Sequence, residues 1–411
     1  MDAPRLPHDV LLNVASFADR TSILALLTTT PNLHSDCGKY VLQDPVVLGG
    51  DLDIVSFIDF MRPHEYKRWR HLHTLRLRGE PISPRIAEAL AGVIPRASHL
   101  ATLEFEHAET TLGSHPDLPL AFAALQTIKN IIISHGYQHT CRMFEAMRWP
   151  LESAELMHSD HEFTHDLHLI HPAALLRNSY ATLKTLEGQL WSDFDDVLDI
   201  YPVYPQLESL CVGGIWCPSV AHWAISYPNL KRLTIDTIDG HIINEAIEDH
   251  FGAYSAIRSR KLEEHMEQER WIRLEEFVGN NALDLYLLGL PCHIRTVVFT
   301  ALSTASLPFF APAMETARPM DLTLSITSEL FSQPIPTYLE SPGLADVKRL
   351  GIAVTIQVCG TDADTGEIDV DCFLVSSFVS RMPMLPLSSL IFRDMSSACC
   401  NVPLLRNLPS S

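Results

Sequence analysis

The chain has 411 residues, of which 46% are hydrophobic and 19% are charged. This composition predicts a folded chain and excludes a largely disordered one. The 30 basic and 50 acidic residues give a formal net charge of −20, which disfavours binding to nucleic-acid phosphates and to anionic membrane surfaces.

The nine cysteines are scattered, odd in number and without a CxxC pair. This usage predicts reduced thiols that mostly pack as small core residues, as in proteins of the cytoplasm or nucleus. The first residues lack a signal pattern, and no apolar run reaches the length of a membrane span. We therefore expect a soluble cytoplasmic or nuclear protein.

Residues 6–33 predict two short amphipathic helices. Pro7 fits the first turn of the first helix, and Thr21 or Ser22 is a candidate cap for the second. The second helix stops in the Thr-rich segment that ends at Pro31. Two helices within about 30 residues cannot bury their own apolar faces, so each must pack against the rest of the chain or against another protein.

This pattern resembles the F-box, the module by which substrate receptors dock onto the Skp-type adaptor of cullin-based ubiquitin ligases. The F-box-like module covers residues 1–43, and the segment from Thr30 to His34 stands in place of the basic, Trp-bearing third helix common in the family. The resemblance implies that the module binds a Skp-type adaptor and through it a cullin ligase. The positions matched to adaptor binding are Leu6, Pro7, Val10, Leu11, Val14, Phe17, Ile23, Leu24 and Leu27.

Residues 44–70 form a predicted connector. It holds a Gly-Gly break, a short apolar helix or strand from Ile54 to Met61, and the basic patch Lys67 to Arg70, which we interpret as a solvated helix end.

From residue 71 to the end of the chain, one apolar pattern returns: an apolar residue, two spacers, an apolar residue, one spacer and an apolar residue. First residues of several successive copies, such as Leu72 and Leu100 or Leu207 and Leu230, lie 23 to 28 residues apart. This period is typical of leucine-rich repeats, in which each unit is a strand followed by a return element. The copies are Leu72-Leu75-Leu77, Leu100-Leu103-Phe105, Leu151-Ala154-Leu156, Leu207-Leu210-Val212, Leu230-Leu233-Ile235, Ile294-Val297-Phe299, Val347-Leu350-Ile352 and Leu387-Leu390-Phe392, with weaker ones at Leu125-Ile128, Leu183-Leu186 and Leu322-Leu324.

Helix-like segments lie between the copies, the clearest running from Pro84 to Ile94 after Ser83 as a cap. Strand, turn and helix in repetition predict an α/β solenoid with parallel strands on the concave side and helices on the convex side. The position where the family carries Asn or Cys holds other residues here, so we expect an irregular solenoid. A charged stretch at about 241–280 predicts a helical insertion.

The histidine-rich run 158–171 contains an H-E-x-x-H pattern. On a helix, His161 and His165 would be zinc ligands and Glu162 a general base, which leaves a zinc-dependent hydrolase as one alternative. A solvated His-rich helix or loop between repeats is the other interpretation, and we expect no metal or other cofactor. The acidic segment 362–366 misses the EF-hand spacing and predicts a hairpin turn.

Spacer residues of the strands would line a groove for a protein target on the concave face. These residues are Thr74, Arg76, Arg78, Thr102, Glu104, Glu106, Ser209, Cys211, Arg232, Thr234 and Asp236.

The whole pattern resembles fungal F-box/leucine-rich-repeat proteins, which implies a non-enzymatic substrate receptor of a Skp–cullin–F-box ligase. The receptor would bind an unknown protein target and neither nucleic acid nor membrane. A repeat scaffold outside ubiquitin ligases, with the N-terminal helices as a cap, is the other alternative; inward-packed Val10 and Phe17 would favour it.

Overall fold

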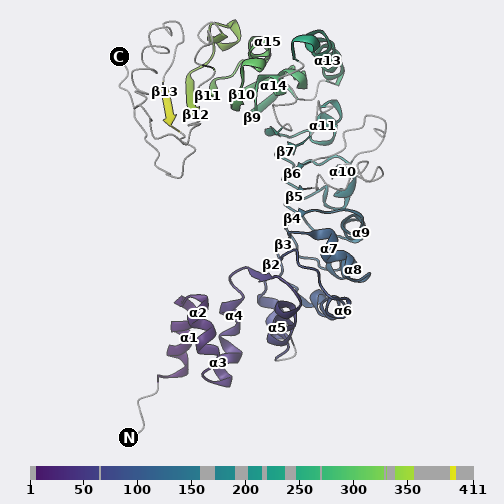
Figure 1. Cartoon of the computed structure of the whole chain (residues 1–411), viewed down its shortest axis with the longest axis vertical. Helices are drawn as coiled ribbons and strands as arrows, with labels where there is room; N and C mark the ends of the chain where they lie inside the picture. Colours follow the sequence, from purple (N-terminus) through teal and green to yellow (C-terminus); the bar gives the residue numbers. More distant parts are fainter. Residues whose placement is uncertain are drawn as a thin grey trace, which may run out of the picture. The chain divides into compact units, whose positions relative to one another are not determined.

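The computed structural model describes residues 6–63, 66–157, 172–189, 202–214, 220–236, 247–268, 271–327, 330, 338–355 and 389–394. The chain divides into two compact units, residues 1–192 and residues 193–411. Both combine helices with parallel strands, and each is described by itself below (Figure 1). The predicted α/β class with a parallel sheet is confirmed.

Unit 1 begins with a small helical bundle. Its helices are α1 (His8–Phe17), α2 (Arg20–Leu27), α3 (Pro31–Asp36) and α4 (Gly38–Val41). The core of the bundle consists of Ala15, Ile23, Leu27, Leu33, Cys37 and Val41.

Local chemistry sets the helix ends of the bundle. The side chain of Asp19, rather than Thr21 or Ser22, caps α2 by accepting a hydrogen bond from the Ser22 N–H at 3.0 Å. Thr30 caps α3 by accepting from the Leu33 N–H at 3.2 Å, and Pro31 occupies the first turn. The segment that interrupts the F-box resemblance is therefore itself helical.

The segment predicted as a connector is already part of the sheet region. It contains strand β1 (Val46–Leu48), helix α5 (Asp51–Met61) and the short 3-10 helix η1 (Lys67–His71). Strand β1 pairs in parallel with the next strand, so the sheet begins before residue 71. The prediction that Lys67 to Arg70 is a solvated helix end is wrong, because Arg68 and Trp69 are buried. Trp69 packs edge-on against Phe57, with the two ring centroids 5.4 Å apart.

The strands of unit 1 follow one another in the sheet in sequence order, and every pair is parallel. Alternate side chains are buried, as expected for a strand with one covered face. The copy predicted at Leu125-Ile128 is displaced: Ile128, Ile131 and Ile133 are the buried positions of its strand. The strands after β1 are β2 (Thr74–Leu77), β3 (Thr102–Phe105), β4 (Asn130–Ser134), β5 (Ser153–Met157) and β6 (Thr185–Gln189).

The helices between these strands lie along one side of the sheet of unit 1 (Figure 1). Their apolar residues cover the buried strand positions. Phe122, for example, packs edge-on against Phe105, with the two ring centroids 5.1 Å apart. These helices are α6 (Pro84–Val93), η2 (Ile94–Arg96), α7 (Ala108–Gly113), α8 (Leu118–Ala123), α9 (Gln138–Ala146), α10 (Pro172–Leu175) and η3 (Arg177–Ser179).

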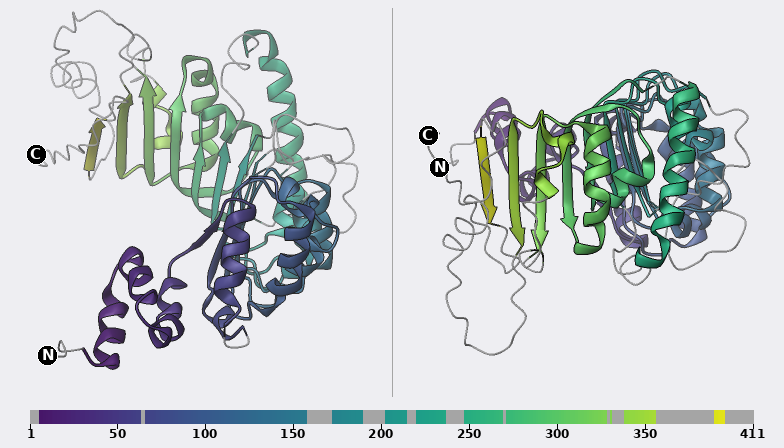
Figure 2. Two further views of the ribbon diagram at one scale, coloured as in Figure 1. Left: turned by 60° about the horizontal axis from the view of Figure 1, so that its bottom comes forward. Right: turned by 90° about the horizontal axis from the view of Figure 1, so that it is seen from above.

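Unit 2 repeats this organisation, and its strands, green to yellow in Figure 2, lie side by side with parallel pairing. The strands are β7 (Ser209–Gly213), β8 (Arg232–Asp236), β9 (Arg273–Gly279), β10 (His293–Leu302), β11 (Asp321–Thr327), β12 (Arg349–Thr355) and β13 (Ser389–Asp394). The helices are α11 (Ala221–Ser226), α13 (Ile247–Gln268), α14 (Ala282–Leu288), η5 (Thr304–Ser306), α15 (Leu307–Ala317) and η7 (Pro342–Leu344).

The helical insertion predicted at about 241–280 is partly wrong. Helix α13 is present, but Leu274 and Phe277 belong to strand β9, which pairs with β8 and β10. Helix α14 follows, with a capping box between Asn281 and Asp284 and with Gly289 in the left-handed conformation at its end. The region therefore contributes a further strand–helix unit, in which Gly279 stands at the third apolar position.

Charged side chains at the residues preceding β4 to β8 link neighbouring strands of the same unit. The Glu152 carboxylate bridges the Lys129 and Lys184 ammonium groups at 2.9 and 2.7 Å. In unit 2 the Lys231 ammonium group lies 2.8 Å from the Glu208 carboxylate. These pairs lie where the chain turns into each strand, so side-chain contacts between neighbouring repeats exist without an asparagine ladder.

Candidate partner-binding surfaces

The outer face of α1 carries large apolar side chains in contact with solvent. Val10, Val14 and Phe17 are spaced along one face of the helix, and they are 40%, 50% and 85% exposed. Leu6 and Pro7, just before the helix, are also exposed, as is Leu24 on α2. Single exposed apolar residues are common on protein surfaces, whereas a row of them along one helix marks an interaction site.

The other residues matched to adaptor binding point inward. Ile23 and Leu27 are buried in the core of the bundle, and half-buried Leu11 packs against that core. The nine predicted residues therefore divide into six exposed ones and three that hold the bundle together.

Contacts within the bundle and to α5 fix the orientation of α1. The His8 imidazole contacts the Asp36 carboxylate of α3 at 2.9 Å. Phe60 of α5 packs against the bundle core from outside. The covered side of α1 is thus occupied by its own bundle, which leaves Val10, Val14 and Phe17 on the opposite side.

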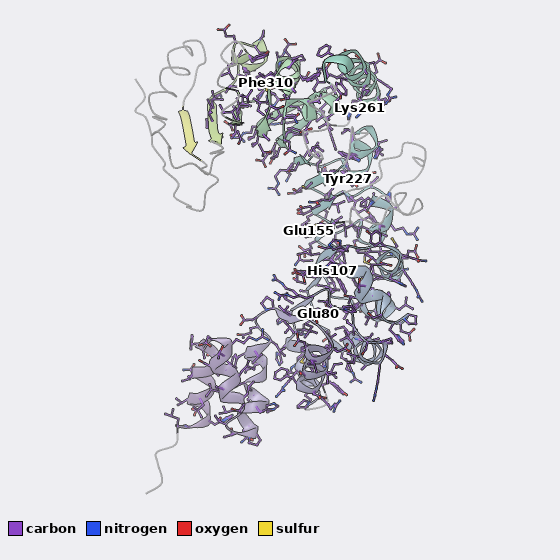
Figure 3. All side chains as sticks on the ribbon, in the orientation of Figure 1. Glu80, His107, Glu155, Tyr227, Lys261 and Phe310 are labelled. Carbon is purple, nitrogen blue, oxygen red and sulfur yellow. The ribbon has the colours of Figure 1, made fainter. Side chains whose placement is uncertain are left out.

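A second candidate surface is the open face of unit 1, which we define as the strand side chains of β2 to β6 that point away from the helices. All of them are half-buried or exposed. Figure 3 shows the labelled Glu155 on this side of the strands. The open face consists of Thr74, Arg76, Thr102, Glu104, Asn130, Ile132, Ser134, Ser153, Glu155, Met157, Thr185, Glu187 and Gln189.

The strand register orders the open face into rows that cross the sheet. One row is polar and uncharged, running from Thr74 through Asn130 to Thr185, and the Asn130 side chain donates a hydrogen bond to the Thr102 hydroxyl at 3.2 Å. The next row is charged and runs, in order, through Arg76, Glu104, Ile132, Glu155 and Glu187.

Two carboxylates of the charged row face each other across adjacent strands. Glu155 and Glu187 are direct register partners on β5 and β6. Desolvation raises the pKa of Glu155, and the nearby charges of Glu187 and Glu104 add to this effect. At the other end of the row the Arg76 guanidinium lies 2.8 Å from the Glu104 carboxylate.

The structure places the predicted target-binding residues on two separate units. Thr74, Arg76, Thr102 and Glu104 lie on the open face of unit 1, with Arg78 and Glu106 exposed just after their strands. On unit 2, half-buried Ser209, Cys211 and Thr234 and exposed Arg232 alternate with buried strand residues. Asp236 ends β8, and its side chain lies outside the described residues.

Two buried cysteines, Cys141 and Cys292, are unsuited to nucleophilic chemistry. Burial raises the pKa of the Cys141 thiol to about 11 and that of Cys292 to about 12. Thiols of such high pKa stay protonated at neutral pH.

Within the described ranges, no group of three or more His, Cys, Asp or Glu side chains could hold a metal ion. Likewise, no helix in these ranges is long and apolar enough to cross a membrane. The His161, Glu162 and His165 pattern and the acidic segment 362–366 lie outside the described residues.

No protein-family model matches the chain, and a search of curated proteins finds no similar sequence.

Sequence reasoning missed Ile132, Glu155 and Glu187 as surface residues. Ile132 lies in a continuous apolar run, Ile131 to Ile133, in which the sequence does not show which side chain points outward. Glu155 and Glu187 lie between apolar residues of repeat copies, so their outward direction could have been inferred. Their direct opposition depends on strand register, which is a property of the folded sheet.

Proposed function

We propose that this chain is the substrate-recognition subunit of a Skp–cullin–F-box type ubiquitin ligase. The N-terminal bundle binds the adaptor, and the strand–helix repeats bind a protein target. The subunit itself performs no chemistry; it holds the target near the ubiquitin-charged enzyme, which raises the effective concentration of the reacting groups.

The observation that carries this proposal is the exposure of Val10, Val14 and Phe17 along α1. If the bundle served only to cap the repeats, Val10, Val14 and Phe17 would be expected to point toward the sheet. They point to solvent instead, while a separate core holds the bundle together. An amphipathic helix with an uncovered apolar face is suited to a hydrophobic groove on a partner.

A binding experiment with the full-length protein and a purified Skp-type adaptor tests the proposal. The variant Val14→Asp/Phe17→Asp places two charges on the outer face of α1 and leaves the core of the bundle intact. The matched control is Leu52→Asp/Val55→Asp on α5, where the two apolar residues are also exposed. Leu11→Asp is unsuitable because Leu11 packs against the core.

We expect the wild-type protein and the α5 variant to bind the adaptor and the α1 variant to lose binding. Circular dichroism and Tm should be similar for all three proteins. Absence of binding by the wild-type protein, or undiminished binding by the α1 variant, would overturn the proposal.

A further inference from the structure

No helix that connects the described strands of unit 1 covers its open face, because these helices lie on the other side of the strands (Figure 1). The central residues of the open face suggest what kind of group it receives. Neighbouring parallel strands are about 4.8 Å apart, which brings register partners on one face into contact distance. Glu155 and Glu187 are such partners, and two like charges in this position destabilise a sheet.

Three cations next to the strands of unit 1 are engaged elsewhere. Arg76 pairs with Glu104, while Lys129 and Lys184 both pair with Glu152 before the strands begin. Within the described part of the chain, no Lys, Arg or His side chain forms an ion pair with Glu155 or Glu187. Among the described residues, the repulsion between the two carboxylates is therefore not compensated by a cation.

Apolar side chains adjoin this pair on the same face. Ile132 is the register partner of Glu155 on β4, and Met157 lies two residues beyond Glu155 on β5. Both are half-buried. A long basic side chain has a matching division, with an apolar stem and a charged end group. Its stem can pack against Ile132 and Met157 while the end group lies between the two carboxylates.

We propose that the open face of unit 1 binds a basic segment of a protein target and receives a lysine or arginine side chain between Glu155 and Glu187. This inference rests on the proposed function, because it names the chemistry of the target that the subunit would recruit. Desolvation disfavours the charged form of Glu155 and raises its pKa. A cation bound beside Glu155 would stabilise the charged carboxylate and offset this effect.

The test is a fluorescence-anisotropy titration of the full-length protein with a labelled synthetic peptide in which lysine alternates with leucine. A peptide with glutamine in place of lysine is the reference ligand. The variant Glu155→Gln/Glu187→Gln removes the two facing charges. The matched control, Glu88→Gln/Glu145→Gln, removes two exposed glutamates from helices α6 and α9 on the other side of the sheet and changes the net charge equally.

We expect the lysine peptide to bind the wild-type protein and the control variant with similar Kd, and the Glu155→Gln/Glu187→Gln variant with a Kd about tenfold higher. The glutamine peptide should bind all three proteins weakly. The Tm of Glu155→Gln/Glu187→Gln should equal or exceed that of the wild-type protein, because the substitution relieves repulsion. Loss of binding would then not be a consequence of misfolding.

Three results would overturn this inference: no binding of the lysine peptide to the wild-type protein, equal loss of affinity in both double variants, or a lower Tm in Glu155→Gln/Glu187→Gln. Adaptor binding measured on the same samples separates the two proposals. A protein that binds the adaptor and not the peptide retains the proposed function with a different target chemistry. A protein that binds neither contradicts both.

Discussion

Arg68 of η1 donates a hydrogen bond through its guanidinium group to the backbone carbonyl of His34 in α3. The same guanidinium donates to the carbonyl of Phe60 and stacks over the Phe60 ring, 4.4 Å from its centroid. One buried side chain thereby connects the N-terminal bundle, helix α5 and the start of the sheet in unit 1.

Replacing Arg68 should weaken this connection. Arg68→Met keeps the apolar stem and leaves two part-buried carbonyls without their donor, so we expect the free energy of unfolding of unit 1 to decrease by about 1–2 kcal/mol. Arg68→Lys keeps the charge but lacks the planar fork, and its effect should be intermediate. Urea denaturation followed by circular dichroism measures both. A Met variant as stable as the wild-type protein would show that the contact is dispensable.

The contacts of Glu152 predict a pH-dependent effect on stability. Its hydrogen bonds and charge interactions with Lys184 and Lys129 lower its pKa from 4.5 to about 2. In the unfolded chain the carboxylate has its ordinary pKa, so the unfolded state binds more protons between these values. The stabilisation is present above about pH 4.5 and is lost as the pH falls toward 2.

Glu152→Gln should therefore have a lower Tm than the wild-type protein at pH 7, and the difference should vanish as the pH approaches 2. High salt should reduce it as well, because both lysines are exposed. Thermal melts over this pH range measure the effect. A Tm difference that does not change with pH would contradict the assigned ion pairs.

His265 on α13 predicts a second pH effect, in unit 2. The side chain is buried beside Trp271, and burial together with the charge of Lys261 lowers the pKa of His265 to about 4. The unfolded chain takes up a proton near the ordinary value of 6.5, so the native state loses stability as the pH falls from about 6.5 to 4. For a shift of this size the loss is on the order of 3 kcal/mol.

His265→Phe keeps an aromatic ring beside Trp271 and removes the titrating group. We expect the free energy of unfolding of the variant to change less than that of the wild-type protein between pH 7 and pH 4. Denaturant titrations at several pH values make the comparison, with His139→Phe, a change of a partly exposed histidine in unit 1, as the control. Parallel pH profiles for the wild-type protein and His265→Phe would show that His265 does not titrate in this range.

The sequence by itself determined where many of the strands and the most clearly marked helices lie. Leu75 and Leu77, or Leu233 and Ile235, alternate with polar spacers, and only a strand with one covered face places such residues on the same side. Pro84 after Ser83 marked the start of α6 in the same way. These are local properties of a short stretch, so they could be inferred without the rest of the chain.

The tertiary structure decided what local patterns leave open. Strand β9 was not predicted because Gly279 occupies the third apolar position of the repeat pattern. The strand is identified by its pairing with β8 and β10. Whether Phe17 or Ile23 faces solvent depends on where the other helices of the bundle pack, although both lie on apolar stretches. Glu155 and Glu187 are separated by a whole repeat and meet only through strand register. The exposure of Phe17 and the pairing of Glu155 with Glu187 both result from packing between segments that are distant in sequence. The details of the two candidate surfaces are therefore seen only in the folded chain.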